Sequence, residues 1–111
     1  MIFLIKKAKM LNDDYLQCVS LLAKSLSDPN RLRILLYVGQ GKKSVGQIVE
    51  EIGISQPLVS HHLKELKRSI LLNVERSGPF VFYELADKKI LDVIRSLNTV
   101  AEDLLKARKT F

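Results

Sequence analysis

The segment that decides the fold reads Ser55-Gln-Pro-Leu-Val-Ser-His-His-Leu-Lys-Glu-Leu66. Ser55 is a favourable N-cap, and Pro57 lies where a missing backbone N–H is harmless, so we expect a helix that starts near Gln56. At about 100 degrees per residue, one side of this helix collects an apolar stripe: Val59, Leu63, Leu66 and Ile70. The segment therefore predicts an amphipathic helix whose apolar side faces a core.

The opposite side of this helix collects side chains that can donate to base acceptors or phosphates: Gln56, Ser60, His61 and Lys64. A surface of this kind suits a DNA major groove, and plain solvation of a polar face is the alternative. His62 flanks the apolar stripe, so we expect it to pack at the edge of the core with a satisfied ring nitrogen. Because adjacent side chains point roughly 100 degrees apart, His61 and His62 are poorly placed to share a metal ion.

Three helical patterns precede this segment. Asp13 or Asp14 opens the first, in which four residues recur at helical spacing: Tyr15, Val19, Leu22 and Leu26. In the second, Asp28 is the expected N-cap and Pro29 the first helical residue, and the residues expected to face inward are Leu32, Leu35, Leu36 and Val38. The residues Gly39-Gln-Gly41 end it.

The third pattern runs from the expected N-cap Ser44 to Ile52, with Val45, Ile48, Val49 and Ile52 apolar, and Gly53 stops it. Only Ile54 separates that glycine from Ser55. Two helices joined by so short a glycine-containing turn, the second with a polar outer face, form a helix-turn-helix.

After Ile70 the apolar period changes from helical to alternating. Leu72 and Val74 alternate with polar residues, and beyond a turn at Ser77-Gly-Pro79 a second alternating run covers residues 80–85. We expect a two-stranded hairpin, or wing, with Arg76 beside its tip, where contact with a phosphate or the minor groove is favoured over solvation. Tyr83 either contacts the DNA backbone or packs.

A long last helix is expected after Asp87, its N-cap. Its apolar seam consists of Ile90, Leu91, Ile94, Leu97, Ala101, Leu104 and Leu105. So long a seam in so small a domain is expected to pack on the first helix and on a symmetry mate. A two-fold homodimer would present two recognition helices to double-stranded DNA, so the expected operator is an inverted repeat with half-sites roughly 34 Å apart.

Composition sets the bounds around these motifs. The 111 residues suffice for one domain, the hydrophobic content of 47% argues against disorder, and the formal charge of +6 favours an acidic partner such as nucleic acid. The opening apolar run, residues 1–5, is too short for a membrane span and precedes Lys6 and Lys7 in the wrong order for a secretory signal, so a cytoplasmic protein without a membrane partner is expected. One cysteine, Cys18, excludes an internal disulfide and a cysteine zinc cluster within one chain.

Three segments in combination resemble the ArsR/SmtB family of winged-helix repressors. They are Asp28-Pro-Asn-Arg-Leu-Arg-Ile-Leu35, Ile54-Ser-Gln-Pro-Leu-Val-Ser-His-His-Leu-Lys64 and Phe82-Tyr-Glu-Leu85, and the resemblance extends from about Leu22 to Leu105. It implies a dimer made by the first and last helices that binds operator DNA and leaves it when an effector arrives. It also places the family's groove-reading positions at Gln56, Ser60, His61 and Lys64, and its wing contacts at Arg76 and Gly78.

The departures from the family concern sensing. Where many members carry metal-binding cysteines, this chain has Ser44-Val-Gly-Gln-Ile-Val-Glu-Glu51, and its last helix offers Asp87, Asp92, Glu102 and Asp103 but no histidine. Zinc, nickel and cobalt sensing are therefore disfavoured, and no metal or cofactor is expected. Cys18 stands alone, so a buried structural role is favoured over an intersubunit disulfide. Relatives often have glycine where Ile70 stands, and since Ile70 poorly tolerates a positive φ, a different exit turn is expected.

The sequence thus predicts a mainly α protein with a small β-hairpin, an α+β winged helix-turn-helix in which the first and last helices form a dimer interface. We expect one domain over residues 1–111, with dimerisation helices at 13–27 and 88–108, the helix-turn-helix at 44–68 and the wing at 71–85. The expected DNA contacts are Ser55, Gln56, Pro57, Ser60, His61, Lys64, Arg76 and Gly78. A repressor is favoured, with its effector unknown. The alternative is a winged-helix module that binds protein, and no nucleophile with a nearby base or phosphate loop points to an enzyme.

Overall fold

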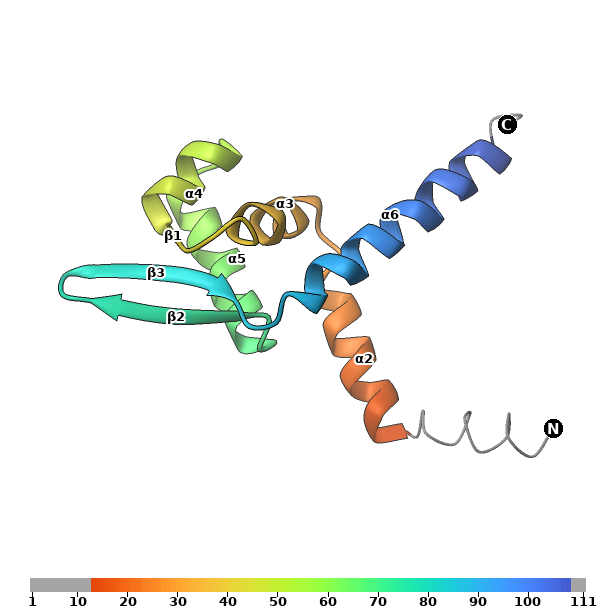
Figure 1. Ribbon diagram of the computed structural model, residues 1–111, viewed down its shortest axis with the longest axis horizontal. Helices are drawn as coiled ribbons and strands as arrows, with labels where there is room; N and C mark the ends of the chain where they lie inside the picture. Colours follow the sequence, from red (N-terminus) through yellow and green to blue (C-terminus); the bar gives the residue numbers. More distant parts are fainter. Residues whose placement is uncertain (1–12, 109–111) are drawn as a thin grey trace.

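The computed structural model describes residues 13–108 (Figure 1). The helices in this range are α2 (Asp13–Ser25), α3 (Pro29–Val38), α4 (Val45–Ile52), α5 (Gln56–Arg68) and α6 (Lys89–Ala107). The strands are β1 (Lys43–Ser44), β2 (Leu72–Ser77) and β3 (Phe80–Leu85). The fold is a winged helix-turn-helix, as predicted. The apolar run at residues 1–5, on which the expectation about membrane spans and signals depended, lies outside the described residues.

The predicted starts of α3 and α4 are confirmed by their capping hydrogen bonds. The Asp28 carboxylate accepts from the backbone N–H groups of Asn30 (2.8 Å) and Arg31 (3.2 Å), with Pro29 in the first turn of α3. Ser44 forms a reciprocal capping box with Gln47 at the start of α4. The prediction that Asp87 is the N-cap of the last helix is wrong by one residue: Lys88 is the N-cap of α6 and makes no side-chain capping bond, although the Asp87 carboxylate still accepts from the N–H of Lys89 at 2.8 Å. These short polar side chains satisfy amide donors that the first helical turn leaves free.

The hydrophobic core lies where α3, α4, α5 and the start of the wing meet. Its buried members are Ile34, Leu35, Val38, Ile48, Val59, Leu63, Leu66, Leu71, Leu72 and Ile94. The prediction that Leu36 faces inward is wrong, because α3 packs through Ile34, Leu35 and Val38, which leaves Leu36 on the opposite, exposed side. Leu32, Leu35 and Val38 face the core as predicted, with Ile34 in place of Leu36.

The sheet has one more strand than the predicted hairpin. The strand order is β1-β3-β2, all antiparallel, and β1 pairs Lys43 with Tyr83 and Ser44 with Phe82. Two residues are too few to give an alternating pattern, which is why the periodicity of the sequence missed β1. Ser44 closes this strand and caps α4 at once, so β1 ties the start of the helix-turn-helix to the wing.

The exit turn from α5 also differs from expectation. Ile70 adopts a φ of +63°, so the prediction that this residue avoids the left-handed region is wrong. The N–H of Leu71 donates to the carbonyl of Leu66 (2.9 Å) and the N–H of Ile70 to that of Lys67 (3.0 Å), the two bonds of a Schellman motif. Leu66 and Leu71, the apolar pair that accompanies this motif, are both buried. Their burial holds the turn even though its left-handed residue is not glycine.

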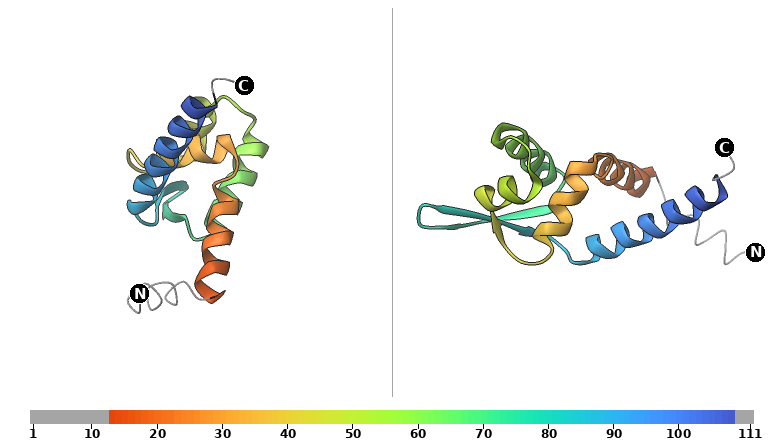
Figure 2. Two further views of the ribbon diagram at one scale, coloured as in Figure 1. Left: turned by 90° about the vertical axis from the view of Figure 1, so that its right-hand side faces the viewer. Right: turned by 90° about the horizontal axis from the view of Figure 1, so that it is seen from above.

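The first and last described helices project from this core in different directions (Figures 1 and 2). Within the protomer α6 meets α3, where Leu91 lies against Gly39, and its packing on the first helix and on a symmetry mate stays a prediction. Both helices consequently carry large apolar side chains in contact with solvent, among them Tyr15, Val19, Leu22, Leu97, Val100 and Leu104. No helix of residues 13–108 is long and apolar enough to cross a membrane.

Candidate nucleic-acid interface

The helix-turn-helix is built by a very short connection between α4 and α5. Gly53 ends α4 in the left-handed conformation, with a φ of +75°, and its N–H donates to the carbonyl of Val49. Ser55 then caps α5, because its hydroxyl accepts from the N–H of Leu58 at 3.4 Å. Pro57 occupies the first turn, where its missing N–H leaves no bond unmade. The left-handed Gly53 and the Ser55 cap therefore fix where α4 ends and α5 begins.

The sides predicted for α5 are found in the structure for all but one residue: the prediction that Ile70 continues the buried apolar stripe is wrong, because Ile70 lies in the turn after the helix and is 77% exposed. Val59, Leu63 and Leu66 are buried, while the polar residues predicted to face DNA are all exposed: Ser55, Gln56, Ser60, His61 and Lys64. Pro57 is exposed with them. The sequence missed Leu58, which is 41% exposed at the start of the same helix. An apolar side chain at this position is of the kind that contacts a thymine methyl group.

His62 lies on the border of the core, as predicted, and is only 4% exposed. Its Nδ1 accepts a hydrogen bond from the Nε–H of Arg31 at 3.2 Å, and its Nε2 lies 3.9 Å from the Asp28 carboxylate. The same carboxylate caps α3. A single acidic side chain thus joins the start of α3 to the middle of α5 through His62 and Arg31.

The surroundings of His62 and Asp28 lower the pKa values of both side chains. Burial is the main reason that the pKa of His62 lies below its ordinary value, and the nearby Arg31 cation acts in the same direction against the attraction of Asp28. Partial burial opposes ionisation of Asp28, but the amides of Arg31 and Asn30 hold the pKa of its carboxyl below the usual range. Both shifts favour a neutral His62 that accepts from Arg31 and an ionised Asp28.

The wing extends from the core as a hairpin with a two-residue loop, Gly78-Pro79 (Figure 1). Gly78 has a φ of +60°, which suits the first position of a tight hairpin turn and which a side chain would make costly. Arg76 is exposed near the tip, opposite Val81. The predicted residues therefore fall into two groups, one on the first turns of α5 and one at the wing tip.

Two aromatic positions of the wing have different environments. Tyr83 is half-buried and packs against the core, so of its two predicted roles the structure favours packing. Phe80 is 62% exposed beside the loop, with its ring 6.4 Å from that of Phe82. Phe80 was not predicted as a contact residue, although its position next to the Gly-Pro turn indicates an exposed tip.

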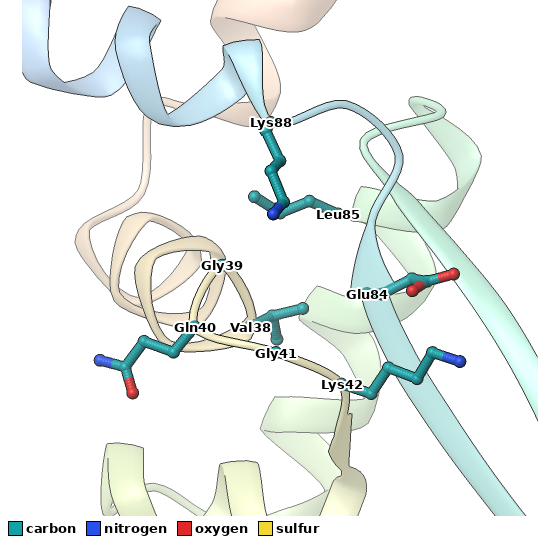
Figure 3. A pocket seen from close by; sticks show the side chains of 8 residues that line it. All are labelled: Val38, Gly39, Gln40, Gly41, Lys42, Glu84, Leu85 and Lys88. Carbon is teal, nitrogen blue, oxygen red and sulfur yellow. The ribbon is translucent and has the colours of Figure 1, made fainter.

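A small hollow of about 130 Å³ lies on another part of the surface, between the loop after α3 and the start of α6 (Figure 3). Lys88 reaches over it beside Leu85, while the side chains of Glu84 and Lys42 point away from it (Figure 3). Lys42 pairs with Glu75 across the wing, and this hydrogen bond raises the pKa of Lys42. The charged groups around this hollow therefore diverge instead of converging on a bound molecule.

The described residues contain no group of three histidine, cysteine, aspartate or glutamate side chains placed to hold a metal ion. The rings of His61 and His62 are 5.8 Å apart and tilted, and they point to different sides of α5. Cys18 is exposed in the protomer, so the burial expected for it is not found within a single protomer. Its helix carries the apolar face that the protomer leaves uncovered.

Comparison with known proteins agrees with this geometry. Residues 28–74 match the model of the bacterial regulatory protein, arsR family. The transcriptional repressor SdpR of Bacillus subtilis is 38% identical over 71 residues, which cover 64% of this chain and 79% of SdpR.

Two solved structures are similar in fold. The homodimeric winged helix-turn-helix DNA-binding domain Mb0332 of Mycobacterium bovis superposes with a TM-score of 0.73 at 27% identity, covering 81% of this chain and 83% of that one. The transcriptional repressor BigR of Xylella fastidiosa does so with a TM-score of 0.71 at 32% identity, covering 79% and 90%. From its matched segment, its similarity to these repressors and its fold, the chain belongs to the arsR family of bacterial regulatory proteins.

Proposed function

We propose that this protein is a transcriptional repressor that binds operator DNA through α5 and the wing. One observation carries the proposal: α5 buries Val59, Leu63 and Leu66 while it exposes a continuous polar side that starts at the helix-turn-helix. The similarity to named repressors of the same family supports it. Such a protein acts where the chromosome is, in the cytoplasm.

Each exposed residue has a role that follows from its chemistry. Gln56 and His61 carry donors and acceptors that suit base edges, whereas Lys64 is a point charge for a phosphate. Ser60, one turn before Lys64, suits either partner. Ser55 and Pro57 lie at the end of the helix that approaches the DNA backbone, where free amides favour a phosphate.

The wing supplies a second contact. Arg76 is exposed close to the tip and carries a guanidinium that suits a phosphate or a narrow minor groove. Gly78 contributes by its backbone, since its positive φ makes the turn tight enough for close approach. The strand β1 holds this hairpin in register with α4, so the two contacts move as one unit.

The active form in this proposal is a homodimer built by α2 and α6. Their exposed apolar side chains belong to a surface that monomeric proteins rarely leave in water. The similar Mb0332 domain is homodimeric. A two-fold dimer would present two α5 helices to an inverted repeat, with half-sites about 34 Å apart, and would exclude polymerase from an overlapping promoter. An effector would act by changing the separation of those helices.

Binding measurements against the promoter of the protein's own gene and a scrambled duplex test the proposal. We expect Lys64→Ala to weaken binding to both duplexes and to lower the salt slope by about 1. We expect Gln56→Ala to relax the preference at one base pair in each half-site, at a cost of about 1–3 kcal/mol.

Lys106→Ala is the matched control, because it removes one lysine from the far end of α6 and leaves α5 and the wing intact. Binding that ignores sequence and is unchanged by substitution at Lys64 and Gln56 would contradict the proposal and favour a protein-binding module instead.

A further inference from the structure

A hollow of about 480 Å³ lies where the end of α2 comes close to the end of α5. Leu21, Lys24 and Ser25 line it from α2, and Glu65, Arg68 and Ser69 line it from the end of α5. Its size is that of a site for a small organic molecule. Unlike the hollow of Figure 3, it is lined by cations from three elements.

The charge of this hollow is unbalanced. Lys24, Arg31 and Arg68 face a single carboxylate, that of Glu65. Within residues 13–108, Lys24 forms no ion pair, and the Arg68–Glu65 pair is loose, with Nη1 3.6 Å from Oε1 and the Arg68 side chain 75% exposed. An exposed pair of this kind contributes little to stability. The hollow therefore has a net positive charge and one ammonium available to an anion.

Arg31 gives the hollow a donor with a fixed position. Its Nε–H is held by His62 Nδ1 at 3.2 Å, and His62 itself is buried beside Asp28. A guanidinium has five N–H donors in a planar fork, so four remain after this bond is made. Because the fork is held before any ligand arrives, less side-chain entropy is lost when it binds an oxyanion.

The remaining walls are partly apolar. Ser25 donates to the carbonyl of Leu21, and its hydroxyl is hydrogen-bonded to that of Ser69, so the base of the hollow ties α2 directly to the exit of α5. Leu21 and the methylene groups of Lys24 and Arg68 add hydrocarbon surface. A ligand that fits these walls has an oxyanion at one end and a short apolar part at the other.

We propose that this hollow binds a small organic oxyanion, a carboxylate or a phosphate ester with a short aliphatic part. Lys24 and Arg31 hold the anionic group, Arg68 closes over it, and Leu21 contacts the aliphatic part. The ligand joins a helix of the proposed dimer surface to the helix of the proposed DNA surface. Its binding to the protein alone does not depend on the proposed function, whereas its effect on DNA does.

Isothermal titration calorimetry of the whole protein tests the site with hexanoate and hexyl phosphate, which distinguish the two sources of the oxyanion. Hexanol and sodium chloride at matched ionic strength are the controls for the apolar and ionic parts. We expect one of the two anions to bind and both controls to fail. If neither anion gives more heat than chloride at the same ionic strength, the proposal is overturned.

Matched variants separate a site from general attraction to a basic protein. The double variant Lys24→Gln/Arg68→Gln is expected to weaken anion binding about tenfold, because it removes two charged donors. Lys67→Gln removes a charge from the same turn of α5 but does not line the hollow, and it is expected to change the affinity less than about twofold. Equal weakening by Lys24→Gln and Lys67→Gln would overturn the proposal.

Operator titrations with and without the bound anion test its regulatory consequence. We expect the anion to change operator affinity about fivefold, with no effect on the double variant, since coupling between sites is typically of this size. Anion binding with an unchanged operator affinity would overturn the regulatory role. Loss of operator binding in the absence of any anion, by contrast, would count against the proposed function and not against the site.

Discussion

The left-handed residue at the end of α5 gives the sharpest prediction about stability. Ile70 has a φ of +63° in a Schellman motif and is 77% exposed. An L-residue in this conformation costs about 1–2 kcal/mol, and glycine avoids that cost. Glycine also adds about 0.4–1 kcal/mol of unfolded-state entropy relative to alanine. We therefore expect Ile70→Gly to be more stable than Ile70→Ala by about 0.5–1 kcal/mol.

Comparison of these two variants isolates the backbone term, because both remove the isoleucine side chain. The control position is Lys67, three residues earlier and within α5, where the order is expected to reverse: Lys67→Ala should be more stable than Lys67→Gly by about 1 kcal/mol. Ile70→Asn is expected to follow glycine, since asparagine tolerates the left-handed region.

Urea unfolding at one fixed protein concentration measures these differences, because the stability of a dimer depends on concentration. With a slope typical of small proteins, the two Ile70 variants should differ in midpoint by about 0.5 M urea. If Ile70→Ala equals or exceeds Ile70→Gly in stability, the left-handed conformation does not carry the assigned cost, and the reasoning is refuted.

Three further outcomes follow from the caps, the buried histidine and the uncovered helices. Asp28→Ala removes the cap of α3 and the carboxylate beside His62, and thermal unfolding should show a loss of about 1–2 kcal/mol, whereas no loss would contradict the capping role. Burial, helped by repulsion from Arg31 and His61 and opposed by the attraction of Asp28, holds the folded-state pKa of His62 below its unfolded value of about 6.5. The stability that neutral His62 contributes is therefore present above a pH of about 6.5 and is lost as the pH falls through the folded-state pKa. Urea midpoints at about pH 7.5 and pH 5.5 should therefore differ less in His62→Gln than in the unchanged protein, and equal differences would exclude His62 as the source. Leu97→Glu places a charge in the proposed dimer surface and should give monomers in light scattering, while Lys106→Glu, also on α6, should not; dimers in both would contradict the assignment of the interface.

Local chemistry made much of the fold predictable. Asp28, Ser44 and Ser55 are short acceptors directly before apolar periodic runs, and each caps the helix that the sequence assigned to it. The buried and exposed sides of α5 could also be predicted, because the angle between successive helical residues separates the two sides without knowledge of the partner elements. The predicted exposure of the candidate DNA contacts follows from the same geometry.

Features that depend on contacts between distant segments could not be predicted from local sequence patterns. The burial of Ile34 instead of Leu36 depends on which side of α3 meets α4 and α5, and the pairing of Lys43 with Tyr83 depends on a strand forty residues later in the chain. The positive φ of Ile70 is a conflict between local preference and burial, since the contacts of Leu66 and Leu71 override what isoleucine favours. Tertiary packing decided each of these cases.

Three sides of α5 have different surroundings, and together they determine its position. One side buries Val59, Leu63 and Leu66, the opposite side is exposed for DNA, and between them His62 and Ser69 connect to Arg31 and Ser25. Since side chains fixed in a packed core leave a helix no freedom to deform along its length, a displacement of α2 acts on α5 as a whole. The contacts on the third side are single hydrogen bonds, between Arg31 and His62 and between Ser25 and Ser69, so a rearrangement there disturbs fewer contacts than one on the apolar side. The side facing α2 is therefore where the proposed oxyanion would act on α5, through the hydrogen bonds of Arg31 and Ser69.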